Sequence, residues 1–126
     1  MEKDKTCKIV FSDIDGTLLT SDGQITEGTK EMILNLEKKG IPFILTSARS
    51  PEGVRVIKRM LGNHAPIIAF CGGLILDDDG NEIYSKMIPL KRALELKAML
   101  DKDFPAVACN TFGGEKWLVD EGDDWR

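Results

Sequence analysis

The sequence predicts an α/β fold built around a parallel sheet. Three short apolar runs, at residues 8–12, 43–45 and 67–70, have the length and composition of buried strands. The segments that separate them, at residues 26–39 and 50–62, have the apolar spacing and the end signals of helices. An alternation of strand, helix, strand, helix and strand is typical of parallel strands joined by helical crossovers.

The first helix is expected to begin after Thr26, whose hydroxyl can cap it. Met32, Ile33 and Leu36 recur at helical spacing and are expected on the inner face of this helix. Gly40 stands where helices commonly end in a left-handed residue.

The second helix opens with Ser50-Pro51-Glu52. These residues supply a capping hydroxyl, a proline suited to the first helical position, and an acid that favours the positive end of the helix dipole. The helix is expected to end at Gly62. Its first turn lies beside the end of the strand at residues 43–45, so its dipole would favour a phosphate there.

After the third strand, residues 74–76 and 82–85 are expected to form a hairpin around Asp77–Asn81. The acidic residues of this connection are interpreted as a turn, because their spacing does not match a calcium-binding loop. His64, the only histidine of the sequence, is expected in a solvated loop.

The composition changes at Pro89. An amphipathic helix is expected from there to about residue 100. Residues 106–109 and 116–119 are expected to form two antiparallel strands joined by Gly113-Gly114.

Composition excludes several classes of protein. The chain has 126 residues, enough for one modest domain with its own core, and a net charge of −4 without a basic stripe. This argues against binding to nucleic acid or to a membrane surface. Cys7, Cys71 and Cys109 lack metal-ligand spacing and are expected to be free thiols in a reducing cytoplasm. Neither a signal peptide nor an apolar run of membrane-spanning length is apparent.

Two carboxylates follow the first strand. If the strand stayed regular, Asp13 and Asp15 would point the same way, and Gly16 would let the backbone approach a ligand closely. Ligands bind at the carboxyl ends of strands in open α/β sheets. A divalent cation such as Mg²⁺ would keep both acids ionised and would tolerate a phosphate between them. Asp13 is therefore a candidate nucleophile toward phosphorus, and Asp15 a candidate general acid and base.

A second polar segment, Thr46-Ser47-Ala48-Arg49, follows the second strand. A hydroxyl at this strand end could donate a hydrogen bond to a transferring phosphoryl group. Arg49 could either contact a substrate phosphate or brace the loop, because arginine suits both bidentate roles.

The run from Ile9 to Leu19 resembles the first motif of haloacid dehalogenase-like phosphohydrolases, and its flanks look most like the Cof-type sugar-phosphatase branch. The resemblance implies a Rossmann-like three-layer core with a parallel sheet, followed by a hairpin and the start of an α/β cap domain. It implies that Asp13 is phosphorylated, and that Asp15 protonates the leaving group and then activates water. Mg²⁺ would be bound by Asp13 and by the backbone carbonyl of Asp15.

The same resemblance implies further phosphate or substrate contacts. The branch usually has Thr-Gly-Arg or Ser-Gly-Arg after the second strand, so Ser47 is the matching hydroxyl and Arg49 the matching arginine. Thr46 is one position off and is interpreted as a strand residue that faces the other way. Gly16 and Thr17 are expected to join the phosphate site.

After the third strand the branch usually has Asn-Gly-Ala or Asn-Gly-Gly, where this chain has Cys71-Gly72-Gly73. Gly72 matches and is expected at the phosphate loop. Cys71 departs from the pattern, offers only weak hydrogen bonds, and is expected to be a small buried residue.

By resemblance, residues 1–88 form the N-terminal part of a hydrolase core and residues 89–126 begin an incomplete cap domain. The family also needs a lysine and a later Gly-Asp-x-x-x-Asp motif, both placed after the cap. The lysines with no such context are Lys86, Lys91, Lys97, Lys102 and Lys116. Gly122-Asp123-Asp124 is interpreted as an acidic, exposed chain end. The sequence is therefore expected to be a fragment whose first strand is an open edge, through which it could form a homodimer.

Three functions follow from these expectations. The first is a cytoplasmic, Mg²⁺-dependent phosphatase of small phosphorylated metabolites, with sugar phosphates as the class that the resemblance implies. The second is a phosphomutase, which would return the phosphoryl group to a sugar instead of water. The third is a catalytically incomplete module that only binds phosphate or Mg²⁺ or serves as an assembly surface.

Overall fold

The computed structural model describes residues 8–114 and 116–119. The chain divides into two compact units, one up to Ser85 and one from Lys86 onward. The first unit contains a sheet of five strands, and the second contains a helix and a two-stranded sheet.

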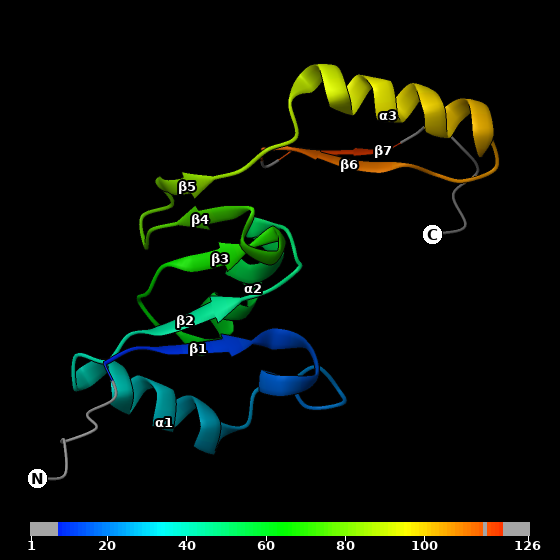
Figure 1. The fold of residues 1–126 in the computed structure, drawn as a ribbon. Coiled ribbons are helices and arrows are strands. Elements are labelled where there is room, and N and C mark those ends of the chain that lie inside the picture. The colour runs from blue at the N-terminus through cyan, green and yellow to red at the C-terminus, as the bar shows by residue number, and fades with distance from the viewer. Residues whose placement is uncertain (1–7, 115, 120–126) are drawn as a thin grey trace, which may run out of the picture. The chain divides into compact units, whose positions relative to one another are not determined.

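The five strands of the first unit stand in sequence order, β1-β2-β3-β4-β5 (Figure 1). The strands β1 (Val10–Asp13), β2 (Phe43–Thr46) and β3 (Ile67–Ala69) pair in parallel, as the sequence predicts. The hairpin of β4 (Leu74–Leu76) and β5 (Glu82–Ser85) then adds two antiparallel strands beside β3. The sheet is thus wider than the three parallel strands expected from the sequence, because the hairpin continues it.

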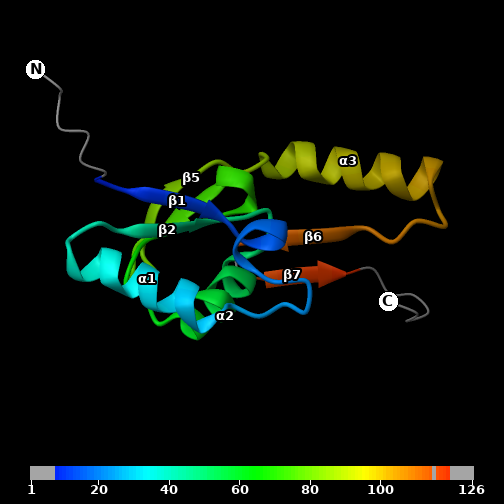
Figure 2. The same cartoon turned by 90° about the horizontal axis from the view of Figure 1, so that it is seen from below.

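Two helices cover the same face of this sheet (Figure 2). The helix α1 (Glu27–Lys38) is capped by the Thr26 side chain, which accepts a hydrogen bond from the Thr29 amide at 3.2 Å. The helix α2 (Pro51–Leu61) is capped by Ser50 and ends at Gly62, which has a φ of +76°. Both helices begin and end within a residue or so of the predicted limits, because their end signals are local.

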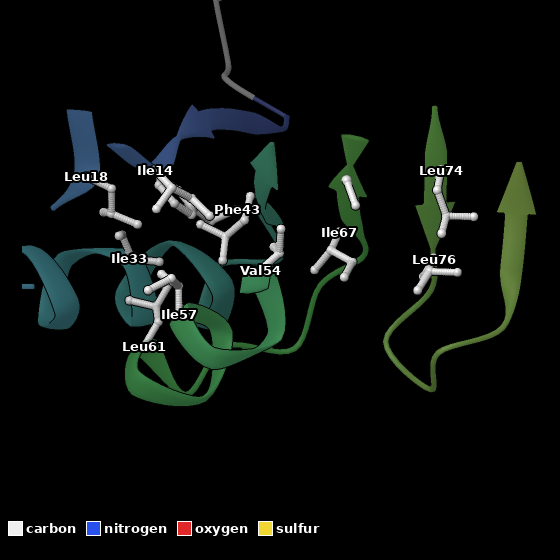
Figure 3. Packing of buried hydrophobic residues seen from close by; sticks show 12 residues of the cluster. Ile14, Leu18, Ile33, Phe43, Val54, Ile57, Leu61, Ile67, Leu74 and Leu76 are labelled. Carbon is white, nitrogen blue, oxygen red and sulfur yellow. The ribbon is translucent and has the colours of Figure 1, made fainter. Parts of the chain in front are cut away.

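The core of the first unit lies between the sheet and these helices (Figure 3). Its buried members are Ile14, Leu18, Ile33, Phe43, Leu45, Val54, Ile57, Leu61, Ile67, Ala69, Leu74 and Leu76. Ile33 is the only residue of α1 in this set, and Leu36 packs partly against it. Met32 is 62% exposed, so its expected place on the inner face of α1 is wrong. One residue is about 100° around a helix, which turns Met32 away from the stripe that contains Ile33.

The other face of the sheet is also apolar. Strand alternation and register place Phe11 beside Ile44 on this face. On the same face Ile68 lies beside Ile75, and Ile75 lies beside Tyr84 of the next strand. Phe11 and Tyr84 remain 57% and 49% exposed at the two edges.

The second unit consists of α3 (Leu90–Asp103) and the antiparallel pair β6 (Asn110–Gly113) and β7 (Lys116–Val119). The rings of Phe112 and Trp117 stack across this pair, with centroids 6.0 Å apart. No described residue of this unit is buried. Within residues 8–114 and 116–119, no helix has both the length and the apolar character needed to cross a membrane.

The first strand of this pair was expected at residues 106–109, which is wrong. Ala106 and Val107 belong instead to a turn in which the Val107 amide donates to the Phe104 carbonyl at 3.0 Å. Pairing starts only at Asn110, where Asn110 stands opposite Val119. The sequence Gly122-Asp123-Asp124 and Cys7 lie outside the described residues.

Candidate active site

The predicted site residues gather at the carboxyl ends of β1 and β2. The last residue of β1, Asp13, stands opposite Thr46, the last residue of β2. Ser47 and Arg49 follow directly in the connection to α2. Parallel pairing therefore brings two segments more than thirty positions apart to one edge of the sheet.

The chain leaves the strand at Asp13 instead of continuing through Asp15. Ile14–Leu18 form one irregular helical turn, closed by a hydrogen bond of 3.1 Å from the Leu19 amide to the Ile14 carbonyl. Gly16 has a φ of +74°, which glycine adopts without strain. The regular strand that would have aligned Asp13 with Asp15 is thus absent. The buried side chains of Ile14 and Leu18 hold this turn against the core.

Asp15 pairs with Arg49. Arg49 Nε donates to Asp15 Oδ2 at 2.9 Å, and Arg49 Nη2 donates to Asp15 Oδ1 at 2.6 Å. These hydrogen bonds hold the pKa of Asp15 below its usual value and raise the pKa of Arg49. While this pair is in place, Asp15 is an ionised carboxylate, suited to accept a proton and not to donate one.

The Ser47 hydroxyl is the buried polar group of the site, with 5% of the residue exposed. Its Oγ accepts a hydrogen bond of 3.2 Å from the Arg49 amide. Because a hydroxyl has one donor as well as acceptor lone pairs, the Ser47 proton is left to donate elsewhere. The Ser47 backbone is fixed on both sides, since its amide donates to Ile68 O at 3.0 Å and its carbonyl accepts from Cys71 N at 2.9 Å.

The segment after β3 closes the site from a third strand. Phe70, Cys71 and Gly72 have φ values of +49°, +53° and +92°. The Phe70 amide donates to the Arg49 carbonyl at 3.0 Å, so this turn is tied to the loop that bears Ser47.

Cys71 is exposed, and the prediction of a small buried residue there is wrong. Its left-handed backbone explains the difference, since the turn directs the chain away from the core at this residue. Asparagine, which the resembling branch has here, is one of the few non-glycine residues that adopt this conformation readily. Cys71 therefore departs from the pattern at a position where the left-handed backbone conformation restricts the choice of residue.

The remaining predicted site residues lie in the segments that end at the same edge of the sheet. Gly16 and Thr17 are exposed in the turn after β1, and Gly72 is half-buried in the turn after β3. Thr46 is half-buried at the end of β2, as expected of a strand residue.

The hairpin acids lie at the opposite end of the sheet. The Asp77 carboxylate accepts a hydrogen bond from the Asn81 amide at 2.7 Å, which closes the turn. The interpretation of these acids as a turn is therefore confirmed. Asp78 instead pairs with Lys58, and its second oxygen lies 3.2 Å from Nδ1 of the exposed His64 ring. Sequence reasoning missed this cluster, because no local signal relates α2 to the hairpin turn.

A cavity of about 550 Å³ opens beside this cluster, between the end of α2 and the hairpin turn. Its size would suit a small metabolite. Two of the cations that line it are already engaged: Lys58 pairs with Asp78, which also lines the cavity, and Arg59 pairs at 2.7 Å with Glu52, which does not. It is also at the amino end of the parallel strands, away from Asp13.

The donor set for a metal is small. Within residues 8–114 and 116–119, no three His, Cys, Asp or Glu side chains come together in a way that could hold an ion. Mg²⁺ typically retains several waters and binds through one or two carboxylates. The exposed Asp13 carboxylate meets that requirement, whereas the Asp15 carboxylate is engaged by Arg49.

Comparison with known proteins gives consistent matches. The family of haloacid dehalogenase-like hydrolases matches residues 10–125. A Haemophilus influenzae protein named "Putative phosphatase" is 40% identical over 123 residues, which cover 90% of this chain and 47% of that protein. The chain thus spans about half the length of the curated relatives it matches.

Solved structures share the fold. A haloacid dehalogenase-like hydrolase from Bacteroides thetaiotaomicron superposes with a TM-score of 0.82 at 21% identity, over 94% of this chain and 46% of the other. A sugar phosphatase of haloacid dehalogenase subclass IIB superposes with a TM-score of 0.69 at 23% identity, over 89% of this chain and 43% of the other.

Proposed function

This chain belongs to the haloacid dehalogenase-like hydrolases, and we propose that it carries the nucleophile of a Mg²⁺-dependent phosphatase. The substrates are small phosphorylated metabolites, and sugar phosphates are the class we favour. The name of the subclass IIB neighbour supports that choice of class. We assign residues 1–88 to the hydrolase core and residues 89–126 to the beginning of a cap domain.

One observation carries the proposal. The register that sets Asp13 against Thr46 brings a free carboxylate, a carboxylate–guanidinium pair and a buried hydroxyl to one sheet edge. A phosphoryl group at this edge would meet a nucleophile at Asp13, a proton carrier at Asp15 and hydrogen-bond donors at Ser47 and Arg49. The exposed turn at Gly16-Thr17 and the half-buried turn at Gly72 are the backbone segments beside this position.

The reaction has two steps. First, an Asp13 carboxylate oxygen bonds to phosphorus, the bond from phosphorus to the leaving oxygen breaks, and Asp15, which has taken up a proton from solvent, gives that proton to the leaving oxygen. Second, water attacks phosphorus, Asp15 takes the water proton, and the bond from Asp13 to phosphorus breaks to release inorganic phosphate. Ser47 donates a hydrogen bond to the phosphoryl oxygens throughout.

Mg²⁺ would be held by the Asp13 carboxylate and the Asp15 backbone carbonyl, with waters completing its coordination. When bound, it would offset the negative charge of the carboxylate and the phosphoryl group. The family resemblance also implies a lysine and a late aspartate at the site, and none of the described residues is assigned to these roles.

The test is Mg²⁺-dependent hydrolysis of p-nitrophenyl phosphate by the wild-type chain and by Asp13→Asn. Removing a covalent nucleophile should lower the rate by about 10³-fold or more. Asp79→Asn is the matched control, since it removes the same charge from the exposed hairpin turn at the other end of the sheet. Activity that persists in Asp13→Asn, or that does not need Mg²⁺, would contradict the proposal.

A second function is favoured by a specific observation. The chain spans about half of its curated relatives, and Arg49, the basic side chain that the described residues bring to the site, is engaged by Asp15. We propose that by itself such a chain can act as a phosphate- or Mg²⁺-binding module without turnover. Phosphate binding in the absence of any hydrolysis would favour this alternative.

Two further proposals concern partners and location. Among the described residues β1 pairs only with β2, and its exposed Phe11 makes this edge a surface through which two copies could associate. The free thiol of Cys71 is compatible with the cytoplasmic location proposed for the protein.

A further inference from the structure

While Asp15 and Arg49 pair with each other, the side chain of each is engaged and is not available to another partner. Each oxygen of the Asp15 carboxylate accepts one guanidinium hydrogen bond, at 2.9 Å and 2.6 Å. A carboxylate held by both oxygens is not oriented toward a leaving group, and a guanidinium held in this way presents less of itself to a phosphate. The contact observed here and the roles proposed above for Asp15 and Arg49 therefore exclude each other.

The backbone of Arg49 is fixed, while its side chain has room to move. The Arg49 amide donates to Ser47 Oγ at 3.2 Å, and the Arg49 carbonyl accepts from Phe70 N at 3.0 Å. The side chain is 37% exposed, and that of Asp15 is 58% exposed. Gly53 lies under the stem of Arg49, where an added Cβ would come within 3.2 Å of Arg49 Cβ. This arrangement anchors the residue and leaves the guanidinium free to change partner.

A phosphate is the natural competitor for this guanidinium. Arginine recognises carboxylate and phosphate with the same bidentate geometry, and a phosphate dianion carries twice the charge of Asp15. An exposed ion pair contributes little to stability, so exchange of one anion for the other costs little.

We propose that the Asp15–Arg49 pair is a latch that an incoming phosphate opens. This inference rests on the proposed function and adds a switch to the same site. With the site empty, Arg49 is a positioning residue that holds Asp15 aside. When phosphate binds, Arg49 turns to it and Asp15 is released toward the leaving group, so the acid/base becomes available only when a substrate is present.

The latch makes an unusual prediction about two equivalent charge removals. Asp13→Asn and Asp15→Asn each remove one negative charge beside the phosphate, and Asp13 is the one proposed to contact phosphorus. Simple repulsion therefore favours the larger gain in phosphate affinity for Asp13→Asn. The latch predicts the reverse order, because only Asp15→Asn also sets Arg49 free.

The experiment measures the dissociation constant of inorganic phosphate for the wild-type chain, Asp13→Asn and Asp15→Asn, and for both variants combined with Arg49→Gln. We expect Asp15→Asn to bind phosphate about fivefold more tightly than Asp13→Asn, the upper end of what an exposed pair supplies. In the Arg49→Gln background this advantage should disappear. Equal affinities of the two single variants, or an advantage that persists without Arg49, would overturn the latch and leave the phosphate site intact.

A second measurement does not depend on phosphate. Exchange of the Arg49 Nε proton with water, followed by ¹⁵N NMR, should be slower in the wild-type chain than in Asp15→Asn, because Asp15 accepts that hydrogen bond. Equal exchange rates would overturn the latch directly. Slow exchange in the wild-type chain with no phosphate binding by any variant would overturn the proposed function and the latch together.

Discussion

The two units of the chain differ in how their apolar residues are used. In the first unit Ile14, Val54 and Leu61 are completely buried between sheet and helices. In the second unit several leucines of α3 remain exposed, with Leu90 74% and Leu94 61% exposed. Both units have regular helices and strands, so secondary structure alone does not distinguish them. What the first unit adds is a layer of two helices packed against one face of its sheet.

This difference indicates where the stability of the chain lies. Burial of apolar surface is the main favourable term in folding, and the first unit has nearly all of it. The second unit depends on local terms, such as helix propensity and the stacked pair Phe112–Trp117. We therefore expect the same type of substitution to have very different effects in the two units.

The largest expected effect is that of Leu45→Ala. Leu45 is 1% exposed in β2, with a paired strand on each side. Its truncation leaves a cavity in the core and should lower the free energy of unfolding by about 2–5 kcal/mol. The measurement is urea denaturation followed by far-ultraviolet circular dichroism.

Leu94→Ala is the control in the second unit, and its effect should stay within about 0.5 kcal/mol, because the side chain is already exposed. Trp117 lies in β7, so its fluorescence gives a probe in the second unit. A fluorescence transition that shifts together with the circular dichroism transition in Leu45→Ala would show that the two units unfold as one, against this comparison.

An intermediate effect is expected from helix capping. The Ser50 side chain caps α2, whereas α3 begins after Pro89, which offers no side-chain acceptor. Ser50→Ala should cost about 1 kcal/mol, and Pro89→Ser should stabilise the start of α3 by a similar or smaller amount. Unfolding curves measure the first effect, and amide hydrogen exchange in the first turn of α3 measures the second. If Pro89→Ser leaves amide hydrogen exchange unchanged, the missing cap does not determine the stability of the first turn of α3.

The sequence was most informative where the structure is local. Ser50-Pro51 and Gly62 limit α2 because caps act within a turn, and the apolar runs of β1 to β3 required no distant partner to be recognised. The shift of β6 to Asn110 shows the limit of this reasoning, since nothing buried fixes the register there.

The site was predicted as a set of residues and not as an arrangement. Asp13 and Ser47 were recognised because each ends a predicted strand. The pairing of Asp15 with Arg49 across 34 positions was missed, because it depends on the turn that bends Asp15 out of the strand. Cys71 was misplaced for a related reason, since two consecutive left-handed residues have no signal in a Phe-Cys sequence.

The smallest expected effect concerns the acid stability of the first unit. Asp78, in the hairpin turn, accepts a hydrogen bond from Lys58 of α2, and its second oxygen faces His64. The hydrogen bond from Lys58, with its charge and that of His64 as smaller causes, holds the pKa of Asp78 below its usual value of 3.8. A lowered folded-state pKa stabilises the fold above the unfolded-state value, and this stabilisation is lost as the pH falls through the folded-state value. Because Asp78 is 41% exposed, the contribution should amount to a few tenths of a kcal/mol.

Asp78→Asn should therefore lose this contribution at neutral pH and narrow the difference in urea midpoint between about pH 7 and about pH 3. Asp101→Asn is the matched control in the second unit, where Asp101 pairs with Lys97 along one exposed helix face at 2.5 Å. That pair joins residues of the same helix and should leave the midpoint of the first unit unchanged at both pH values. An equal effect of the two substitutions would mean that the Lys58–Asp78 contact does not tie the hairpin to α2, and that the loss of one negative charge accounts for both effects. A larger effect of Asp78→Asn, confined to the neutral side of the transition, would locate part of the first unit's stability in this tie between two elements, for which the second unit has no described counterpart.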